Sequence, residues 1–142
     1  MSLNFIQDFQ QLTYRLLSGD PNIRLQVDRI YLSVVQDAKY PFILINILKA
    51  DNISTRRQDI YEIDLEICGF ARDKNQAVLT LLADQITNKL VVSSYLPQHY
   101  SVASLKACNI NFGRSLDLIT GKMTINYKAL LKGNETNYAR EV

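Results

Sequence analysis

Three carboxylates alternate with apolar residues in the stretch DIYEIDLEICGF, residues 59–70, at positions Glu62, Asp64 and Glu66. In an extended strand, alternate side chains lie on one face, about 6.7 Å apart. Carboxylates arranged in this way can act as an acid and base pair or can bind a hard cation. However, no glycine-rich calcium loop accompanies them, and a regular strand face lacks the recess that catalytic carboxylates use. The pattern therefore favours a solvated face, or a charged assembly surface or lumen, over a metal or catalytic site.

A pair of arginines, Arg56 and Arg57, lies between Asp51 and Asp59 in a polar part of the sequence. Guanidinium groups bind phosphates and carboxylates, so the pair is suited to contact a phosphate or a neighbouring subunit. One such pair is also typical of a solvated loop, and a net charge of +2 does not indicate a nucleic-acid-binding protein. The candidate interface residues are therefore Arg56, Arg57, Asp59, Glu62, Asp64 and Glu66.

The remaining reactive side chains do not form a recognisable site. His99 is the only histidine, and sequence spacing places no nucleophile beside it. Cys68 and Cys108 lack CxxC spacing, so we expect two reduced, partly buried thiols rather than a zinc or redox motif. The sequence contains no GxGxxG, P-loop or HExxH motif. We accordingly expect no catalytic residue, no metal and no cofactor, and we expect that the protein is not an enzyme.

Length and charge limit the possibilities further. A chain of 142 residues can bury its own core as one domain. No apolar run approaches the roughly 20 residues of a membrane span, so we expect no membrane association. Residues 51–100 contain seven acidic and five basic side chains, whereas residues 101–142 contain three acidic and six basic ones. This difference is suited to a head-to-tail contact between identical subunits, although ordinary solvated charge explains it as well.

Two segments have helical periodicity. In residues 2–18, apolar side chains recur at helical spacing, and we expect Gly19 to close this helix in a left-handed conformation. Asp20-Pro21 is predicted to prevent its continuation. Residues 73–90 are predicted to form a second helix, with Asp73 as N-cap and Gln76 completing a capping box. Its buried stripe is predicted to consist of Val78, Leu79, Leu82, Ile86 and Leu90.

Five segments are rich in the β-branched and aromatic residues that are typical of strands, at residues 29–35, 40–48, 59–70, 102–112 and 121–131. Because proline lacks a ladder donor, Tyr40-Pro41 is predicted to fix where the second strand begins. Residues 50–58 are predicted to form a hairpin loop or arm.

Short connections between these strands favour antiparallel pairing of neighbours. The predicted fold is α+β, with a mainly antiparallel sheet of four to five strands covered on one face by two helices, in the order α-β-β-β-α-β-β. We expect one domain over residues 1–132 and a polar, mobile tail over residues 133–142.

One block of the sequence resembles a known family. Residues 29–31 (RIY), followed by residues 38–45 (AKYPFILI), resemble the signature of the tail terminator, or tail completion, proteins of long-tailed bacteriophages. The later segments occur in the order of that family, so that the resemblance spans roughly residues 3–131. Family members often have a tryptophan where Cys68-Gly69-Phe70 stands here, and this chain has none. We expect Phe70 to fill the same apolar space.

The resemblance implies a structural virion protein of a phage, a prophage or a gene transfer agent. It implies a ring, usually a hexamer, that caps the completed tail tube, ends tube polymerisation and forms the head–tail joining surface. The implied partners are further copies of the chain, the major tail tube protein and the head–tail connector protein. DNA would pass through the ring lumen without sequence-specific binding. The implied location is the tail or neck of the virion, after synthesis in the bacterial host cytoplasm.

In such a ring we expect Glu62, Asp64 and Glu66 to lie at the contact between subunits or to face the lumen. Arg56 and Arg57 would lie on an arm that reaches a neighbouring subunit or the tube. Three other functions stay open from the sequence: another neck or head-completion protein, a small ligand-binding or regulatory domain, and an enzyme.

Overall fold

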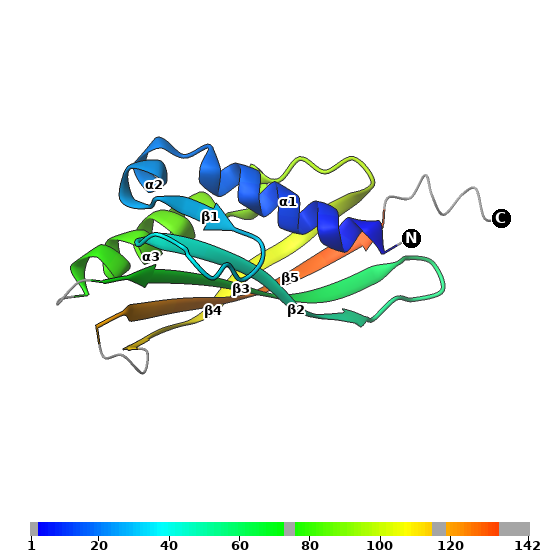
Figure 1. Cartoon of the computed structure of the whole chain (residues 1–142). Coiled ribbons are helices and arrows are strands. Elements are labelled where there is room, and N and C mark those ends of the chain that lie inside the picture. The colour runs from blue at the N-terminus through cyan, green and yellow to red at the C-terminus, as the bar shows by residue number, and fades with distance from the viewer. Residues whose placement is uncertain (1–2, 73–75, 115–118, 134–142) are drawn as a thin grey trace.

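The computed structural model describes residues 3–72, 76–114 and 119–133, and all structural statements below concern this part of the chain. Figure 1 shows its helices and strands, which in chain order are α1 (Asn4–Ser18), α2 (Pro21–Gln26), β1 (Arg29–Tyr31), β2 (Phe42–Asn52), β3 (Ile60–Ala71), α3 (Ala77–Lys89), the 3₁₀ turn η1 (Val92–Ser94), β4 (Tyr100–Arg114) and β5 (Gly121–Gly133). No helix in these ranges is both long and apolar enough to cross a membrane.

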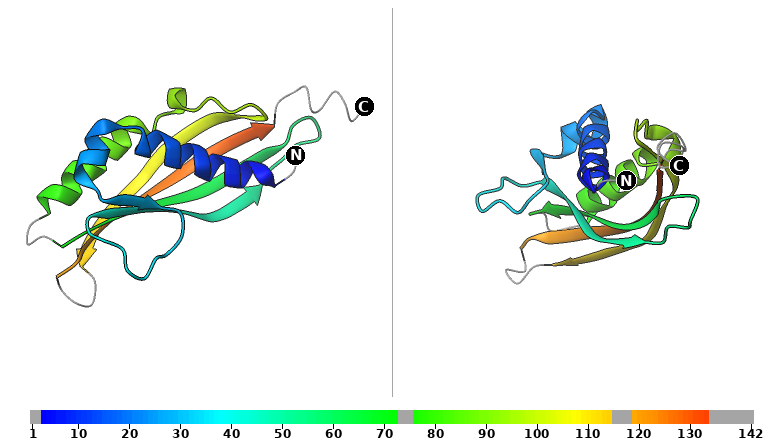
Figure 2. Two further views of the ribbon diagram at one scale, coloured as in Figure 1. Left: turned by 45° about the horizontal axis from the view of Figure 1, so that its top comes forward. Right: turned by 90° about the vertical axis from the view of Figure 1, so that its right-hand side faces the viewer.

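The strands form one sheet in the order β1-β2-β3-β5-β4, in which β1 is parallel to β2 and the other neighbours are antiparallel. Helices α1 and α3 lie on the same face of this sheet (Figure 2). In the described part of the chain, no helix covers the opposite face, which we call the open face. The predicted α+β fold, with helices on one face of a mainly antiparallel sheet, is confirmed.

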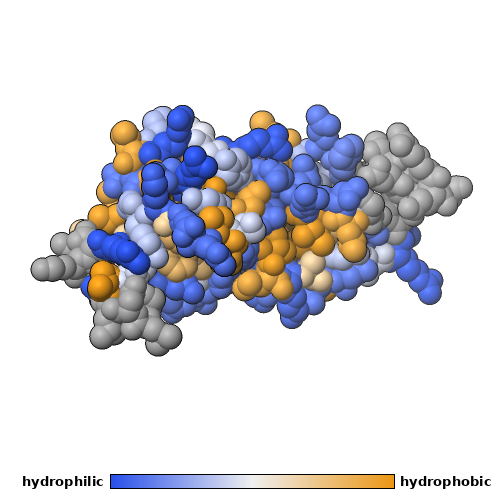
Figure 3. All heavy atoms as spheres, in the orientation of Figure 1, coloured by the Kyte–Doolittle hydropathy of each residue, from blue (hydrophilic) through white to orange (hydrophobic). Residues whose placement is uncertain are grey.

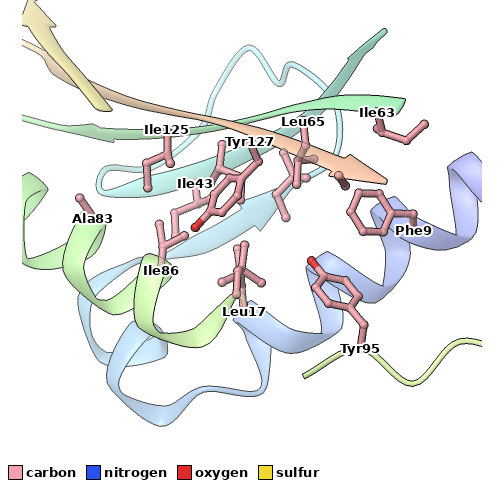
Figure 4. Close-up of a cluster of buried hydrophobic side chains, with 14 of the residues drawn as sticks. Phe9, Leu17, Ile43, Ile63, Leu65, Ala83, Ile86, Tyr95, Ile125 and Tyr127 are labelled. Atoms are coloured by element: carbon pink, nitrogen blue, oxygen red, sulfur yellow. The ribbon is translucent and has the colours of Figure 1, made fainter. Parts of the chain in front are cut away.

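The core lies between the helices and the sheet. In β3, the side chains of Ile63, Leu65 and Ile67 are fully buried, as the alternation in the sequence predicts. They pack with Phe9 and Leu17 of α1 and with further buried side chains of α3 and β5 (Figure 4). Since burial of one such side chain contributes about 1.5–3 kcal/mol, this layer is the main source of stability.

A polar pair is buried in this core. The Thr13 hydroxyl donates its only hydrogen to the carbonyl oxygen of Phe9, across 2.9 Å. The Tyr95 hydroxyl, 3.0 Å from Thr13 Oγ1, must therefore be the donor in their contact. Tyr95 also stacks on Phe9, with ring centroids 5.3 Å apart. These contacts attach the segment between η1 and β4 to α1.

The end of α1 differs from the prediction. Gly19 has φ −81°, so the expected left-handed conformation is wrong. A Cβ at this position would lie 3.0 Å from the Arg15 carbonyl oxygen, a tight contact that glycine avoids. Asp20 and Pro21 do end α1, but they also begin α2. The Asp20 carboxylate accepts hydrogen bonds from the backbone N–H groups of Asn22 and Ile23, and Pro21 occupies a first-turn position that needs no N–H donor.

The start of α3 also differs. Gln76 itself is the N-cap residue and makes no side-chain capping hydrogen bond, so the predicted capping box is wrong. Asp73 lies outside the described residues. The predicted stripe is confirmed for Leu79, Leu82, Ile86 and Leu90, which are buried, and Val78 packs half-buried against the core.

The first two strands depart most from the prediction. Strand β1 ends at Tyr31, and its parallel pairing with β2 contradicts the expected antiparallel hairpin. The chain between them, residues 32–41, is long enough to return to the end of the sheet where β1 began, as parallel strands require. Strand β2 starts directly after Pro41, as predicted, and the Tyr40–Pro41 peptide bond is cis.

The loop predicted at residues 50–58 is displaced, because β2 continues to Asn52 and only residues 53–59 connect it to β3. The last two strands are present as predicted. Strand β4 is longer at both ends, and β5 begins at Gly121 as predicted and extends to Gly133, the first residue of the predicted tail; the rest of that tail lies outside the described residues.

Candidate functional site

The acidic candidates lie on the open face of the sheet. Glu62, Asp64 and Glu66 alternate along β3 with side chains that point into the core, so their carboxylates point away from the helices. All three are half-buried. The predicted placement on one strand face is therefore confirmed. Whether that face contacts another subunit stays a prediction.

Lysines from the neighbouring strands flank these carboxylates. Lys128 Nζ of β5 lies 3.4 Å from Glu62 Oε1 and 3.9 Å from Asp64 Oδ1. On the other side, Lys49 of β2 is in register with Asp64 and forms an ion pair with Asp51 at 3.1 Å. The hydrogen bond that Lys49 donates to the Asp51 carboxylate, together with the negative charge of that carboxylate, raises the pKa of Lys49. The acidic and basic parts of the sequence are thus partly neutralised within one subunit.

These groups do not form a metal site. Within the described ranges, no group of three His, Cys, Asp or Glu side chains is arranged to hold a metal ion. Exposed ion pairs of this kind contribute little to stability. Their usual effect is to set the orientation and rate of encounter with a charged partner.

The arginine candidates lie elsewhere, at the tip of the β2–β3 hairpin. Arg56 and Arg57 are exposed in the connection 53–59. Asp59 is at the base of this connection, where its carbonyl oxygen accepts a hydrogen bond from Gly133 N–H at 2.8 Å. The acidic residues therefore lie together on β3, whereas the two arginines belong to the β2–β3 connection, which lies beyond the ends of both strands (Figure 1).

An aromatic cluster at the opposite end of the sheet was not among the predicted site residues. Phe42 stacks on Phe70 at 4.7 Å and also contacts Tyr40 and Tyr31, with ring centroids 5.2 and 5.7 Å away. The Arg72 guanidinium lies 4.4 Å above the Tyr40 ring. Each aromatic pair contributes about 0.5–1.5 kcal/mol beyond its buried area. The Tyr-Pro-Phe block was the sequence signal for this cluster. Phe70 packs in it against Phe42, and its equivalence to the tryptophan of tail terminator proteins stays a prediction.

This cluster lines a hollow of about 260 Å³, which we call the aromatic pocket. Its lining residues are Tyr31, Ser33, Val34, Val35, Tyr40, Phe42, Leu44, Phe70 and Thr120. Pockets for small ligands usually have volumes of about 300–1,000 Å³. The aromatic pocket is therefore better matched to one or two side chains of a protein partner.

A larger hollow of about 450 Å³ lies between the helices and β1. Charged side chains of Arg24, Asp28 and Arg29 contribute to its lining. Small-ligand sites are instead mostly apolar with a few placed polar groups. This hollow gives weak support to a ligand-binding function.

Of the other reactive residues, Cys68 lies beside the acidic candidates, and its thiol donates a hydrogen bond to Glu66 Oε1 across 3.3 Å. Cys68 is buried, and this burial raises the pKa of its thiol to about 11. Both cysteines are free thiols, as predicted, but Cys108 is exposed, so its predicted partial burial is wrong. His99 is exposed just before β4.

The fold is similar to that of a chain in a solved structure described as the virion of a native gene transfer agent (GTA) particle. The TM-score is 0.74 at 15% sequence identity, and the match covers 87% of this chain and 94% of that chain. No family model and no curated protein matches the sequence. The similarity shows a shared fold, and the resemblance to tail terminator proteins stays a prediction.

Proposed function

We propose that the protein is a structural component of a tailed phage particle or gene transfer agent, in which it caps the tail tube. The observation that carries the proposal is the fold match to a chain of a gene transfer agent virion, which spans nearly the whole of both chains. In this role, copies of the protein form a ring, expected to be a hexamer, that ends tube growth and offers a joining surface to the head-side connector. The order of segments in the sequence, with its RIY and AKYPFILI blocks, supports the same role.

The surface of the protein is compatible with docking. One face of the sheet lacks a helical cover within the described part of the chain and presents mixed charges at one end and aromatic side chains at the other. A ring requires two different patches on each subunit, because every copy contacts the next one head to tail. Recognition by shape and charge makes or breaks no covalent bond, so we propose a role without catalysis.

Deletion of the gene tests this function. We expect particle preparations to contain abnormally long tails and tails not joined to heads, since nothing would end tube polymerisation. Electron microscopy of negatively stained particles measures both, and expression of the intact chain should restore tail length. Filled heads that leak DNA beside tails of normal length would indicate a head-completion protein instead. Particles unchanged in tail length, joining and DNA retention would contradict the proposal.

Removing the charges of the acidic strand tests the assigned role of Glu62, Asp64 and Glu66. We propose the triple variant E62Q/D64N/E66Q, because charge reversal would also repel Lys128 within the subunit. We expect about tenfold weaker assembly on the tail, equivalent to about 1.4 kcal/mol, with an unfolding temperature close to that of the unmodified protein. Asp84→Asn, at an exposed position on α3, is the control. Normal tail length and ring density in the triple variant would contradict the role assigned to these three carboxylates.

A further inference from the structure

Strand β4 is an outer strand of the sheet and carries two exposed apolar side chains. Ile110 and Phe112 are 42% and 41% exposed, within a run from Lys106 to Arg114 in which every residue is exposed. They are in register with Ile125 and Met123 of β5, which are fully buried on the helix-covered face. Ile110 and Phe112 therefore point to that same face, at an edge that the helices do not cover.

The aromatic pocket lies at the opposite edge of the same sheet, next to β1. Its side chains from β2 and β3, Phe42, Leu44 and Phe70, belong to the open face. Val34 on its rim is 83% exposed and Val35 is 43% exposed. Figure 3 shows apolar groups at the surface on this side of the molecule, over β1, β2 and the segment between them.

The strand register places the two features at the same level along the strands. One row of paired residues runs across the sheet from Phe112 through Met123 and Gly69 to Ile43. Ile43 lies between Phe42 and Leu44, the two pocket residues of β2. Phe112 therefore lies at one edge of the sheet and on its helix-covered face, whereas the pocket lies at the other edge and on the open face. The two features are at nearly the same position along the strand direction.

This arrangement allows identical copies to overlap. If copies are related by rotation about an axis roughly along the strands, the β4 edge of one copy can lie beneath the β1–β2 edge of the next. The helix-covered face of the sheet at the β4 edge of one copy then contacts the open face at the β1–β2 edge of the next copy. A contact between two different patches repeats from copy to copy and closes into a ring when the rotation permits.

We infer that Phe112 of one copy inserts into the aromatic pocket of the next copy, with Ile110 packing beside it. The inference rests on the proposed function for the closure of these contacts into a ring. Large apolar side chains seated in a partner's pocket are the typical anchors of protein interfaces.

A second copy of the chain as the occupant of the aromatic pocket accounts for both exposed apolar patches, which other occupants do not. A small ligand in the pocket would leave the exposure of Ile110 and Phe112 unexplained. A tube protein bound at either edge would leave the apolar patch at the other edge in water. Head-to-tail contact covers both patches with the same interaction.

Disulfide trapping tests the contact. The variant V34C/G113C, in a C108S background, places one thiol on the pocket rim and one beside Phe112 while keeping all the apolar anchors. A Cβ at Gly113 meets no atom within 4 Å, so the substitution fits. Cys68 can remain, because it is buried and its raised thiol pKa of about 11 leaves little thiolate at pH 8. Under mild oxidation of concentrated protein and of purified particles, we expect a ladder of dimers, trimers and larger species.

The matched controls are V34C alone and G113C alone in the same background, neither of which should form a ladder. Adding Phe112→Asp to the double-cysteine variant should reduce cross-linking about 30-fold, the equivalent of about 2 kcal/mol for an interface anchor. Phe112→Ser serves as a second variant without a new charge. Both changes are at an exposed position, and an unchanged unfolding temperature would verify that the subunit is intact.

A mixing experiment tests whether the contact is head to tail. Phe112→Asp and Val35→Arg should each abolish assembly of the otherwise unmodified protein. An equimolar mixture should form dimers, because one intact Phe112 can still enter one intact pocket.

Three results would overturn the inference: no ladder in either sample, a ladder that persists with Phe112→Asp and Phe112→Ser, or equal cross-linking of G113C alone. Long tails after gene deletion without a ladder would leave the proposed function standing and remove this contact. A ladder without any tail defect would support this contact and contradict the proposed function.

Discussion

Leu17→Ala is expected to lower the free energy of unfolding by about 2–5 kcal/mol. Leu17 is in the last turn of α1 and has no exposed surface. Its side chain points from the helix into the core between Ile86 and Tyr95 (Figure 4). Truncation removes apolar contacts and leaves a cavity between two layers that cannot close fully. Since domains are stable by only about 5–15 kcal/mol, urea denaturation should reveal a large shift of the midpoint.

Leu25→Ala is the matched control for this prediction. Leu25 lies in α2, and 82% of its surface is exposed. Leucine and alanine differ little in helix propensity, so both substitutions have the same small effect on the helix itself. We expect the control to change the unfolding free energy by less than about 0.5 kcal/mol. Similar losses in the two variants would contradict the placement of the buried face of α1.

The protein is expected to lose stability steeply above pH 10. Burial raises the pKa of Tyr95 to about 12, and burial also raises the pKa of Tyr100 and of Tyr127 above the ordinary value of 10.0. A raised pKa means that the native state holds the proton more tightly than the unfolded state. The stabilisation is therefore complete below pH 10 and is lost as the pH rises toward the native pKa. Each tyrosine contributes a loss of up to about 1.4 kcal/mol per pH unit in this range.

Urea denaturation at several pH values between 8 and 12 measures this dependence. Tyr127→Phe keeps the buried ring and removes one of the three ionising groups. Its stability should fall less steeply above pH 10, by up to about 1.4 kcal/mol per pH unit relative to the unmodified chain. An equally steep fall in Tyr127→Phe would mean that the Tyr127 hydroxyl is accessible to water in the native protein.

The parts of the fold that depend on local patterns were predictable from the sequence. The two-residue alternation of β3 assigns Ile63 and Leu65 to the core and Glu62 and Asp64 to the opposite face, because strand geometry alone decides this. The pairing of β1 with β2 was not predictable, since its direction depends on the path of residues 32–41. Pro21 was ambiguous, because the same residue can stop one helix and begin another.

The candidate site was predictable only in part for the same reason. The carboxylates of β3 were found from their spacing. Their proximity to Lys128 follows from the position of β5 beside β3, which no local pattern encodes. The aromatic pocket combines Tyr31, Phe42 and Phe70 from three separate strands. Of these, Tyr31 and Phe42 belong to the distinctive RIY and AKYPFILI blocks of the sequence, and Phe70 does not.

The position of β5 between β3 and β4 affects how the molecule is made. This strand, Gly121–Gly133, is the last strand of the described residues and has a neighbour on both sides. During synthesis, β4 and the edge of β3 that pairs with β5 therefore have no partner until residues 121–133 have left the ribosome. A nascent chain cannot present a finished β4 edge before that point. We therefore expect the β4 edge to become available for docking to another copy only after β5 has inserted between β3 and β4.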